Sequence, residues 1–334
     1  MNRDRSVGSP GRRDGVAAIL VYHRIADVEV DPFGLCVRPE RFDAQLEALR
    51  EIGRIVHLRE LAVDVTNGEL AGPAVALTFD DGYADNLDVA APLLERHRVP
   101  ATVFVVTDNA EDGATFWWDE LTALVLGPPT AVRPIRVTIS GAEYEWTPDD
   151  VTGAGEDLRG WRAWEAPPGP RARAYRELWG LLQPLDPGAR DVVLDQLRSQ
   201  LGDEARTADR PLGSDELVEL TRSGLVEVGA HTGSHPRLAD LSLPDQEREI
   251  VRSKRWLEEV LGSEVRSFSY PYGLAENYGP ETVSIVRRAG FRYACAVALE
   301  PVTPNSSPLE LPRLPVEDWE PAELAARISS LFGR

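Results

Sequence analysis

The sequence is poor in cysteine and in positive charge, and it has no long apolar run. Its two cysteines, Cys36 and Cys295, are too few for a disulfide framework and lie in no CxxC or other metal-type spacing, so we interpret both as buried thiols. The excess of 55 acidic over 36 basic residues gives a formal charge of −19, and such a surface repels phosphate backbones and anionic headgroups. These shortages argue against a disulfide-rich protein and against nucleic acid or a membrane surface as a partner.

The N-terminal segment lacks the apolar stretch of an export signal. Met1 to Asp14 are polar and basic, and we expect residues 1–14 to be disordered. The first apolar run, Gly15 to Tyr22, has the length of a strand and is too short for a signal peptide or a membrane span. We therefore expect a cytoplasmic protein without stable membrane insertion, unless an export signal precedes Met1.

Short apolar runs alternate with helical patterns toward both ends of the chain. A hydrophobic content of 43% with 27% charged residues is typical of a soluble globular protein with a substantial core. The alternation favours an α/β fold, in which βα units build a mostly parallel sheet or barrel. The expected strands are Val16–Tyr22, Ala74–Phe79, Thr102–Val106, Leu225–Gly229, Ser267–Tyr270 and Tyr293–Val297. The expected helices are Arg41–Ile52, Leu87–Arg96, Pro244–Leu261, which Ser242 and Gly262 should cap, and Pro280–Ala289.

The middle of the chain, residues 113–213, has a different composition. It contains Trp117, Trp118, Trp146, Trp161, Trp164 and Trp179 among clusters of proline, glycine and arginine. Because a structureless stretch of this length is implausible in a compact domain, we predict an inserted, mainly helical cap subdomain with a hairpin near Ile135 to Tyr144. Residues 15–112 and 214–334 would form the main domain. The tryptophans either stack on sugar rings or fill a small helical core.

Pairs of polar residues follow two of the expected strands. Asp80 and Asp81 stand in Thr-Phe-Asp-Asp-Gly, and His231 and His235 stand in His-Thr-Gly-Ser-His. Each pair alone is compatible with a solvated turn, but the carboxyl ends of parallel strands share one face. Carboxylate and imidazole are ligands of divalent zinc, so the two pairs together favour a metal site.

Two further segments also end strands. Tyr270-Pro-Tyr-Gly273 contains a proline and a glycine that would fix a bent backbone and expose an amide N–H, which can stabilise an oxyanion. A tight turn with core aromatics is the simpler interpretation of this segment alone. His23 ends the first strand, and a lone histidine is more often structural than catalytic.

Together these segments resemble the polysaccharide deacetylase family, the NodB-homology carbohydrate esterases. Thr78 to Gly82 and His231 to His235 match its two metal-site motifs, and Tyr270 to Gly273 is similar to its third. The resemblance covers about residues 15–110 and 214–318. It implies a distorted (β/α)7-type barrel, a hydrolase of linear amide bonds and one divalent metal ion. The implied roles are metal binding for Asp81, His231 and His235, general base for Asp80, and an oxyanion contact from the Tyr272 amide.

Two departures from the family pattern matter. The third motif often has an arginine three residues before its tyrosine, and this chain has Ser269 there. A partner for Asp80 must then come from elsewhere, and Arg313 is our candidate. No histidine follows His235, although many members take their catalytic acid from a late histidine. His23 resembles a permuted arrangement in which the first strand carries that acid.

The sequence therefore predicts metal-dependent removal of the N-acetyl group from an amino sugar in a glycan, glycolipid or sugar precursor. His23, as an imidazolium, would protonate the departing amine. Zinc is the expected ion, and cobalt, nickel or iron also suit such a site. The alternatives are a hydrolase of non-sugar amides or formamides and a non-catalytic carbohydrate-binding relative. The missing export signal favours a lipid-linked or nucleotide-linked precursor over a finished polymer, and the sequence carries no indication of the oligomeric state.

Overall fold

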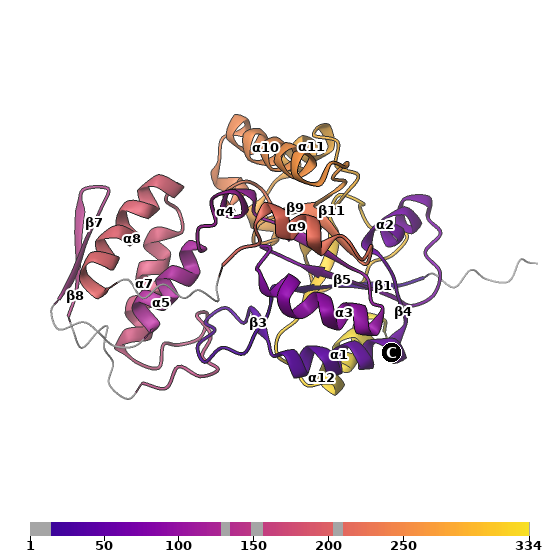
Figure 1. Ribbon diagram of the computed structural model, residues 1–334, viewed down its shortest axis with the longest axis horizontal. Coiled ribbons are helices and arrows are strands. Elements are labelled where there is room, and N and C mark those ends of the chain that lie inside the picture. The colour runs from indigo at the N-terminus through magenta and orange to yellow at the C-terminus, as the bar shows by residue number, and fades with distance from the viewer. Residues whose placement is uncertain (1–14, 128–133, 148–155, 203–209, 334) are drawn as a thin grey trace, which may run out of the picture.

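The computed structural model describes residues 15–127, 134–147, 156–202 and 210–333. The predicted disordered N-terminus, residues 1–14, lies outside this part of the chain. Figure 1 shows a barrel surrounded by helices and, at its left, a smaller unit of helices with a hairpin. Within the described residues, we find no helix with the length and apolar character needed to cross a membrane.

The centre of the larger unit is a parallel sheet that closes on itself. Its strand order is β1-β12-β11-β10-β9-β6-β5-β4, and β1 also pairs with β5. All of these strands except the short β4 (Arg54–Ile55) therefore form a ring, which confirms the (β/α)7-type barrel. The ring consists of β1 (Ala17–Tyr22), β5 (Ala74–Phe79), β6 (Ala101–Val105), β9 (Val226–Ala230), β10 (Ser267–Ser269), β11 (Tyr293–Val297) and β12 (Leu311–Pro315).

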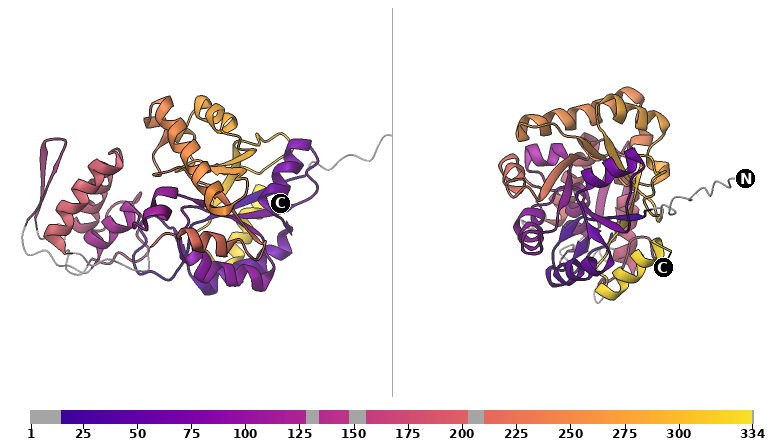
Figure 2. Two further views of the ribbon diagram at one scale, coloured as in Figure 1. Left: turned by 45° about the horizontal axis from the view of Figure 1, so that its top comes forward. Right: turned by 90° about the vertical axis from the view of Figure 1, so that its right-hand side faces the viewer.

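Helices surround the barrel, as the two views of Figure 2 show. They are α1 (Pro39–Ile52), α2 (Leu58–Asn67), α3 (Ala91–His97), α4 (Thr107–Asp112), α9 (Ser214–Leu220), α10 (Leu243–Leu261), α11 (Pro280–Arg288) and α12 (Pro321–Leu331). Short elements complete this unit: β2 (Arg24–Ile25), β3 (Cys36–Val37), η1 (Asn86–Ala90), η2 (Leu238–Asp240) and η3 (Ala275–Asn277). Both predicted caps of α10 are present, because the Ser242 side chain accepts from Asp245 N–H and Gly262 ends the helix at φ 63°.

One predicted helix is wrong as a continuous α-helix. The segment expected over Leu87–Arg96 begins as the π-helix η1 and becomes the α-helix α3 only at Ala91. Pro92 stands in the first turn of α3, where a proline fits because its missing N–H needs no helical partner. The wider turns of η1 precede this point, and π-turns inside helices are frequent near functional sites.

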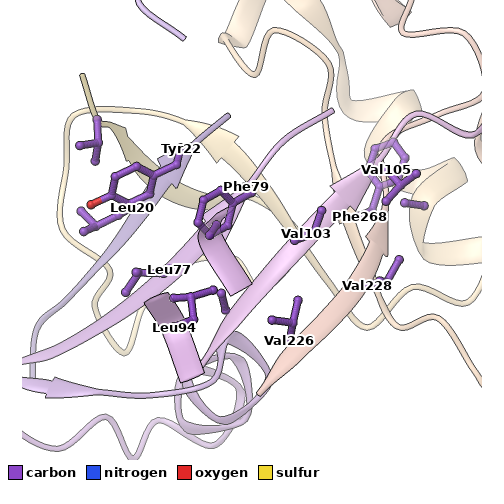
Figure 3. Close-up of a cluster of buried hydrophobic side chains, with 14 of the residues drawn as sticks. Leu20, Tyr22, Leu77, Phe79, Leu94, Val103, Val105, Val226, Val228 and Phe268 are labelled. Atoms are coloured by element: carbon purple, nitrogen blue, oxygen red, sulfur yellow. The ribbon is translucent and has the colours of Figure 1, made fainter. Parts of the chain in front are cut away.

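Alternate residues of each strand pack on the two faces of the barrel wall. Figure 3 shows the outward side chains that pack beneath the helices, among them Leu20, Leu77, Val103 and Phe268. The inward side chains range in size from alanine to aromatic residues such as phenylalanine and are tightly packed. A Cβ on Gly229 would stand only 2.4 Å from the Ser267 hydroxyl oxygen, so this position has no room for a side chain. The inward cluster includes Ala17, Ile19, Ala74, Ala76, Phe104, Cys295 and Leu311.

The smaller unit has a hydrophobic core of its own. It consists of α5 (Trp117–Leu126), α7 (Pro170–Leu182), α8 (Pro187–Leu201) and an antiparallel hairpin, β7 (Ile135–Ile139) with β8 (Ala142–Trp146), at the predicted position. Trp146 and Trp161 are buried in this core, whereas Trp164 is 62% exposed. The tryptophans of the insert therefore differ in their surroundings.

Candidate metal centre and active site

The predicted site residues meet at the carboxyl end of the barrel. A cavity of about 620 Å³ opens there, between the strand ends and the helical subdomain. The site residues that line it are His23, Asp80, Asp81, His231, His235 and Tyr272. Arg313 lies behind Asp80 with 1% of its surface exposed. The fold thus brings together all the residues that the motifs singled out.

Asp81, His231 and His235 form a compact, buried group that can hold a metal ion. One ligand atom from each residue lies within 4.8 Å of the others. Asp81 Oδ1 stands 3.7 Å from His231 Nε2 and 3.6 Å from His235 Nε2. His231 Nδ1 donates to the Ser269 carbonyl at 2.8 Å, which leaves the Nε2 lone pair free toward Asp81.

The electrostatics of this group also fit a cation. Asp81 Oδ1 is buried without a hydrogen-bond partner, which is costly for a polar atom. Burial, and then the neighbouring Asp80, raises the pKa of Asp81 well above its ordinary value. Burial, and then the neighbouring His231, lowers the pKa of His235. A divalent ion would satisfy the free oxygen and favour the ionised carboxylate and the neutral imidazoles.

Three site residues have left-handed backbone. The φ angles are 73° at Asp81, 55° at His235 and 62° at Tyr272, and Gly82 follows at 82°. A non-glycine residue in this region loses roughly 1–2 kcal/mol relative to the right-handed form. Such strain is concentrated at functional sites, where surrounding structure holds the chain in place.

Arg313 and Asp80 form a buried, bidentate ion pair. Nη1 of Arg313 donates to Oδ1 of Asp80 at 2.7 Å, and Nη2 donates to Oδ2 at 2.6 Å. Burial by itself raises the pKa of Asp80, but the charge and hydrogen bonds of Arg313, together with His231 and His23, outweigh burial and hold this pKa well below its ordinary value. Asp80 is therefore an ionised carboxylate, oriented by a planar partner.

Ser269 occupies the position where the family motif often has arginine. Its hydroxyl accepts from Arg313 Nη2 at 2.7 Å and donates to Asp80 Oδ2 at 3.2 Å. The small Ser269 side chain leaves room for the guanidinium that arrives from β12. The contact between Arg313 and Asp80, which we expected because the motif lacks its usual arginine, is thus present. The catalytic role of Arg313 stays a prediction.

The charge of His23 bears on its expected role as the acid. Burial lowers the pKa of His23 to about 4, against the smaller opposing effect of Asp80. The ring is therefore a neutral imidazole near neutral pH, so the imidazolium that we expect at the amine-protonation step must form during the reaction. Its place on the cavity wall is compatible with proton transfer, but the proton must reach it during the reaction.

Two residues of the site were not predicted from the sequence. The Trp118 ring packs on His235 at a centroid distance of 4.9 Å, and its Nε1 donates to the Tyr83 hydroxyl at 2.8 Å. Tyr83 in turn donates to Asp119 Oδ2 at 2.7 Å. The aromatic cluster at Phe116 to Trp118 was the available signal, but its contact with a metal ligand depends on the docking of α5 against the barrel.

Comparison with known proteins identifies the family. The model of the polysaccharide deacetylase family matches residues 67–131 and 199–294, which include both metal-site motifs and the third motif. The chain belongs to the polysaccharide deacetylase family. The match confirms the family that the sequence motifs indicated and, at the level of the family, the prediction of a hydrolase. The permuted origin of the histidine acid stays a prediction.

Individual relatives share the fold and part of the sequence. The poly-β-1,6-N-acetyl-D-glucosamine N-deacetylase of Staphylococcus aureus strain MSSA476 is 24% identical over 115 residues, which cover 32% of this chain and only 39% of that protein. The Streptococcus pyogenes deacetylase PplD superposes with a TM-score of 0.58 at 19% identity, over 95% of this chain and 99% of PplD. IcaB from Ammonifex degensii gives 0.55 at 20% identity, over 95% and 98% of the two chains. At these identities the structures support the fold alone.

Proposed function

We propose that this protein hydrolyses the N-acetyl group of an amino sugar within a glycan. One observation carries the proposal: a buried Asp81, His231 and His235 group that can hold a metal lies beside Asp80, an ionised carboxylate paired with Arg313. The staphylococcal relative, 24% identical over 115 residues, is an N-deacetylase of poly-β-1,6-N-acetyl-D-glucosamine, and this likeness supports a similar reaction here.

A divalent ion held by Asp81, His231 and His235 would supply Lewis acidity toward the amide oxygen and would acidify a water molecule. Zinc is the ion that best suits one carboxylate and two imidazoles, and cobalt, nickel and iron are also compatible. The free Asp81 oxygen and the Nδ1 hydrogen bond of His231 both support this ligand set.

Asp80 is the proposed acceptor of the proton of the attacking water. Because Arg313 keeps it ionised, the carboxylate is ready as a base at neutral pH. The Tyr272 amide is the proposed donor to the developing oxyanion, since the left-handed backbone of this residue turns the chain at the cavity wall.

His23 is the proposed acid for the departing amine. Its pKa of about 4 in the free protein means that it starts the reaction neutral. Negative charge that develops on the carbonyl oxygen favours a protonated neighbour, so the ring would take over the proton that Asp80 accepts from the attacking water as the amide carbon becomes tetrahedral. His23 would then deliver that proton to the sugar nitrogen.

The proposal is tested with metal-loaded protein and a panel of N-acetylated sugars, namely free, nucleotide-linked and polymeric, by measuring released acetate. Asp81→Ala should lose both metal and turnover, whereas Asp80→Asn should keep the metal and lose turnover. Asp318→Asn is the matched control, because this surface carboxylate pairs with Arg38 away from the cavity. Equal metal loss in both site variants would refute the division of roles, and fully loaded protein that releases no acetate would contradict the function.

A further inference from the structure

Aromatic side chains outside the metal group also line the cavity. Trp164, Trp179 and Phe33 are among them, and the rings of Phe33 and Trp179 lie 5.3 Å apart. Trp179 comes from α7 of the subdomain, and Phe33 comes from the segment between β2 and β3. The total volume, about 620 Å³, lies in the range of roughly 300–1,000 Å³ that is typical of pockets for extended small ligands.

Trp164 is unusual among these aromatic residues. Its 62% exposure contrasts with that of Trp146 and Trp161 in the same subdomain, which are 6% exposed and serve the core. An indole left in water forfeits the stabilisation that its burial would give, so a largely exposed tryptophan beside a cavity points to a ligand.

The turn that carries Trp164 is held firmly from both sides. Ala163 N–H donates to the Pro32 carbonyl at 2.7 Å, and Arg162 Nη1 donates to the Asp31 carbonyl at 2.9 Å. On the other side, Arg176 Nη1 donates to the Glu165 carbonyl at 2.8 Å. These hydrogen bonds hold the backbone that carries the indole in place. Ligand binding would therefore cost little conformational entropy in this turn.

Polar side chains also line the cavity. Arg237 Nε donates to Asn277 Oδ1 at 3.0 Å, and Glu276, the residue before Asn277, lines the cavity as well. A pyranose ring has an apolar C–H face and a rim of hydroxyl groups. A cavity lined by both aromatic and polar side chains matches both parts of such a ring.

We propose that Trp164, with Trp179 and Phe33, forms a binding subsite for a second sugar of the substrate chain, next to the sugar at the metal group. This inference rests on the proposed function and narrows it. The substrate is an oligomeric or polymeric glycan, free or lipid-linked, and not the nucleotide-linked monosaccharide that the sequence left open.

The test compares β-linked N-acetylglucosamine tetrasaccharides, in 1,4-linked and 1,6-linked series, with the monosaccharide. The wild type should give a higher kcat/KM with a tetrasaccharide than with the monosaccharide. Trp164→Ala should lower the tetrasaccharide value by about 3- to 10-fold, the range expected for loss of one aromatic stacking contact, and leave the monosaccharide value unchanged. Trp164→Phe should retain most of the tetrasaccharide value because it keeps an aromatic face.

Val192→Ala is the matched control, because Val192 is 58% exposed on α8 of the same subdomain and does not line the cavity. If Trp164→Ala lowers kcat/KM equally for the tetrasaccharide and the monosaccharide, or changes neither value, the subsite proposal is wrong. Acetate release by the wild type would still support the proposed function. Isothermal titration calorimetry with the catalytically inactive Asp80→Asn variant tests the opposite case, in which the subsite exists but the proposed function is wrong. Tetrasaccharide binding that depends on Trp164, in a protein whose wild type releases no acetate, would overturn the function and support the subsite.

Discussion

Replacing Arg313 by methionine tests the central ion pair of the site. Arg313 is fully buried, and its guanidinium donates to both oxygens of Asp80 as well as to Thr78 and Ser269. Methionine keeps much of the side-chain length but removes the charge and these donors. Because Asp80 would remain as a buried charge without its partner, we expect a loss of about 3–5 kcal/mol in the free energy of unfolding.

The variant should also reverse the pH dependence that Asp80 contributes. In the wild type Arg313 lowers the folded-state pKa of Asp80, so this stabilisation is present above the unfolded value of about 3.9 and is lost as pH falls below it. In Arg313→Met burial, the largest single effect on this pKa, raises it without the guanidinium to oppose it. The contribution of Asp80 to stability should then decrease as pH rises through the raised pKa, and mild acid should recover part of the loss.

Urea denaturation of metal-free proteins at pH 5 and pH 7.5 measures this effect, and the pH profile of kcat/KM measures its catalytic counterpart. The acid limb of that profile should move to higher pH in Arg313→Met, because the base must be ionised. The double variant Asp80→Asn with Arg313→Met is the control, and it should be more stable than Arg313→Met alone at pH 7.5. Equal stability of these two variants would refute the reasoning, since the unpaired carboxylate would then not be the cause.

Two more perturbations test the surroundings of the site. The low pKa of His23, about 4 against an ordinary 6.5, means that the wild type should lose up to about 3 kcal/mol from this group as pH falls from 6.5 to 4. His23→Gln should show a weaker acid dependence in urea denaturation of metal-free protein, and an unchanged dependence would contradict the assigned pKa. Tyr83→Phe removes the acceptor of the buried Trp118 N–H and should destabilise the fold by about 1–3 kcal/mol. Since Trp118 packs on His235, zinc titration should also show weaker binding, and unaltered affinity would exclude this coupling.

Much of the barrel could be predicted from the sequence because its strands are continuous apolar runs that end abruptly in polar residues. Ala74–Phe79 and Tyr293–Val297 were predicted with the bounds that the structure has. Strands buried on both faces give such runs, and their ends are marked by the residues that do the chemistry. The same feature that defined β5 therefore also located Asp80 and Asp81.

The strand that carries Arg313 was not predicted. In β12 the sequence Leu311-Pro-Arg-Leu-Pro315 contains two prolines, which lack the N–H of a strand ladder and argue against a central strand. The ring closes through β12 all the same, because its partners in β1 and β11 supply the remaining pairings. Arg313 was found as a candidate only because Asp80 needed a partner.

The charge of His23 and the roles of the tryptophans could not be predicted for a different reason. Both depend on which distant segments cover a side chain. His23 follows β1 directly, yet its pKa is set by burial at the cavity and by charges on other strands. Trp118 and Trp164 lie in the same composition-biased region of the sequence. Only the folded structure shows that the Trp118 ring packs on His235 and that Trp164 is largely exposed.

The left-handed residues explain why backbone strain and chemistry coincide here. Asp and His enter this region more readily than most residues, whereas Tyr272 is a bulky exception. All three follow barrel strands, where the chain must turn back over the strand end to bring a side chain or an amide into the cavity. A relaxed loop would continue outward along the strand and carry these groups into solvent. The strain at Asp81, His235 and Tyr272 is therefore the consequence of assembling the site on the barrel rim, and the packed strands beneath hold it in place.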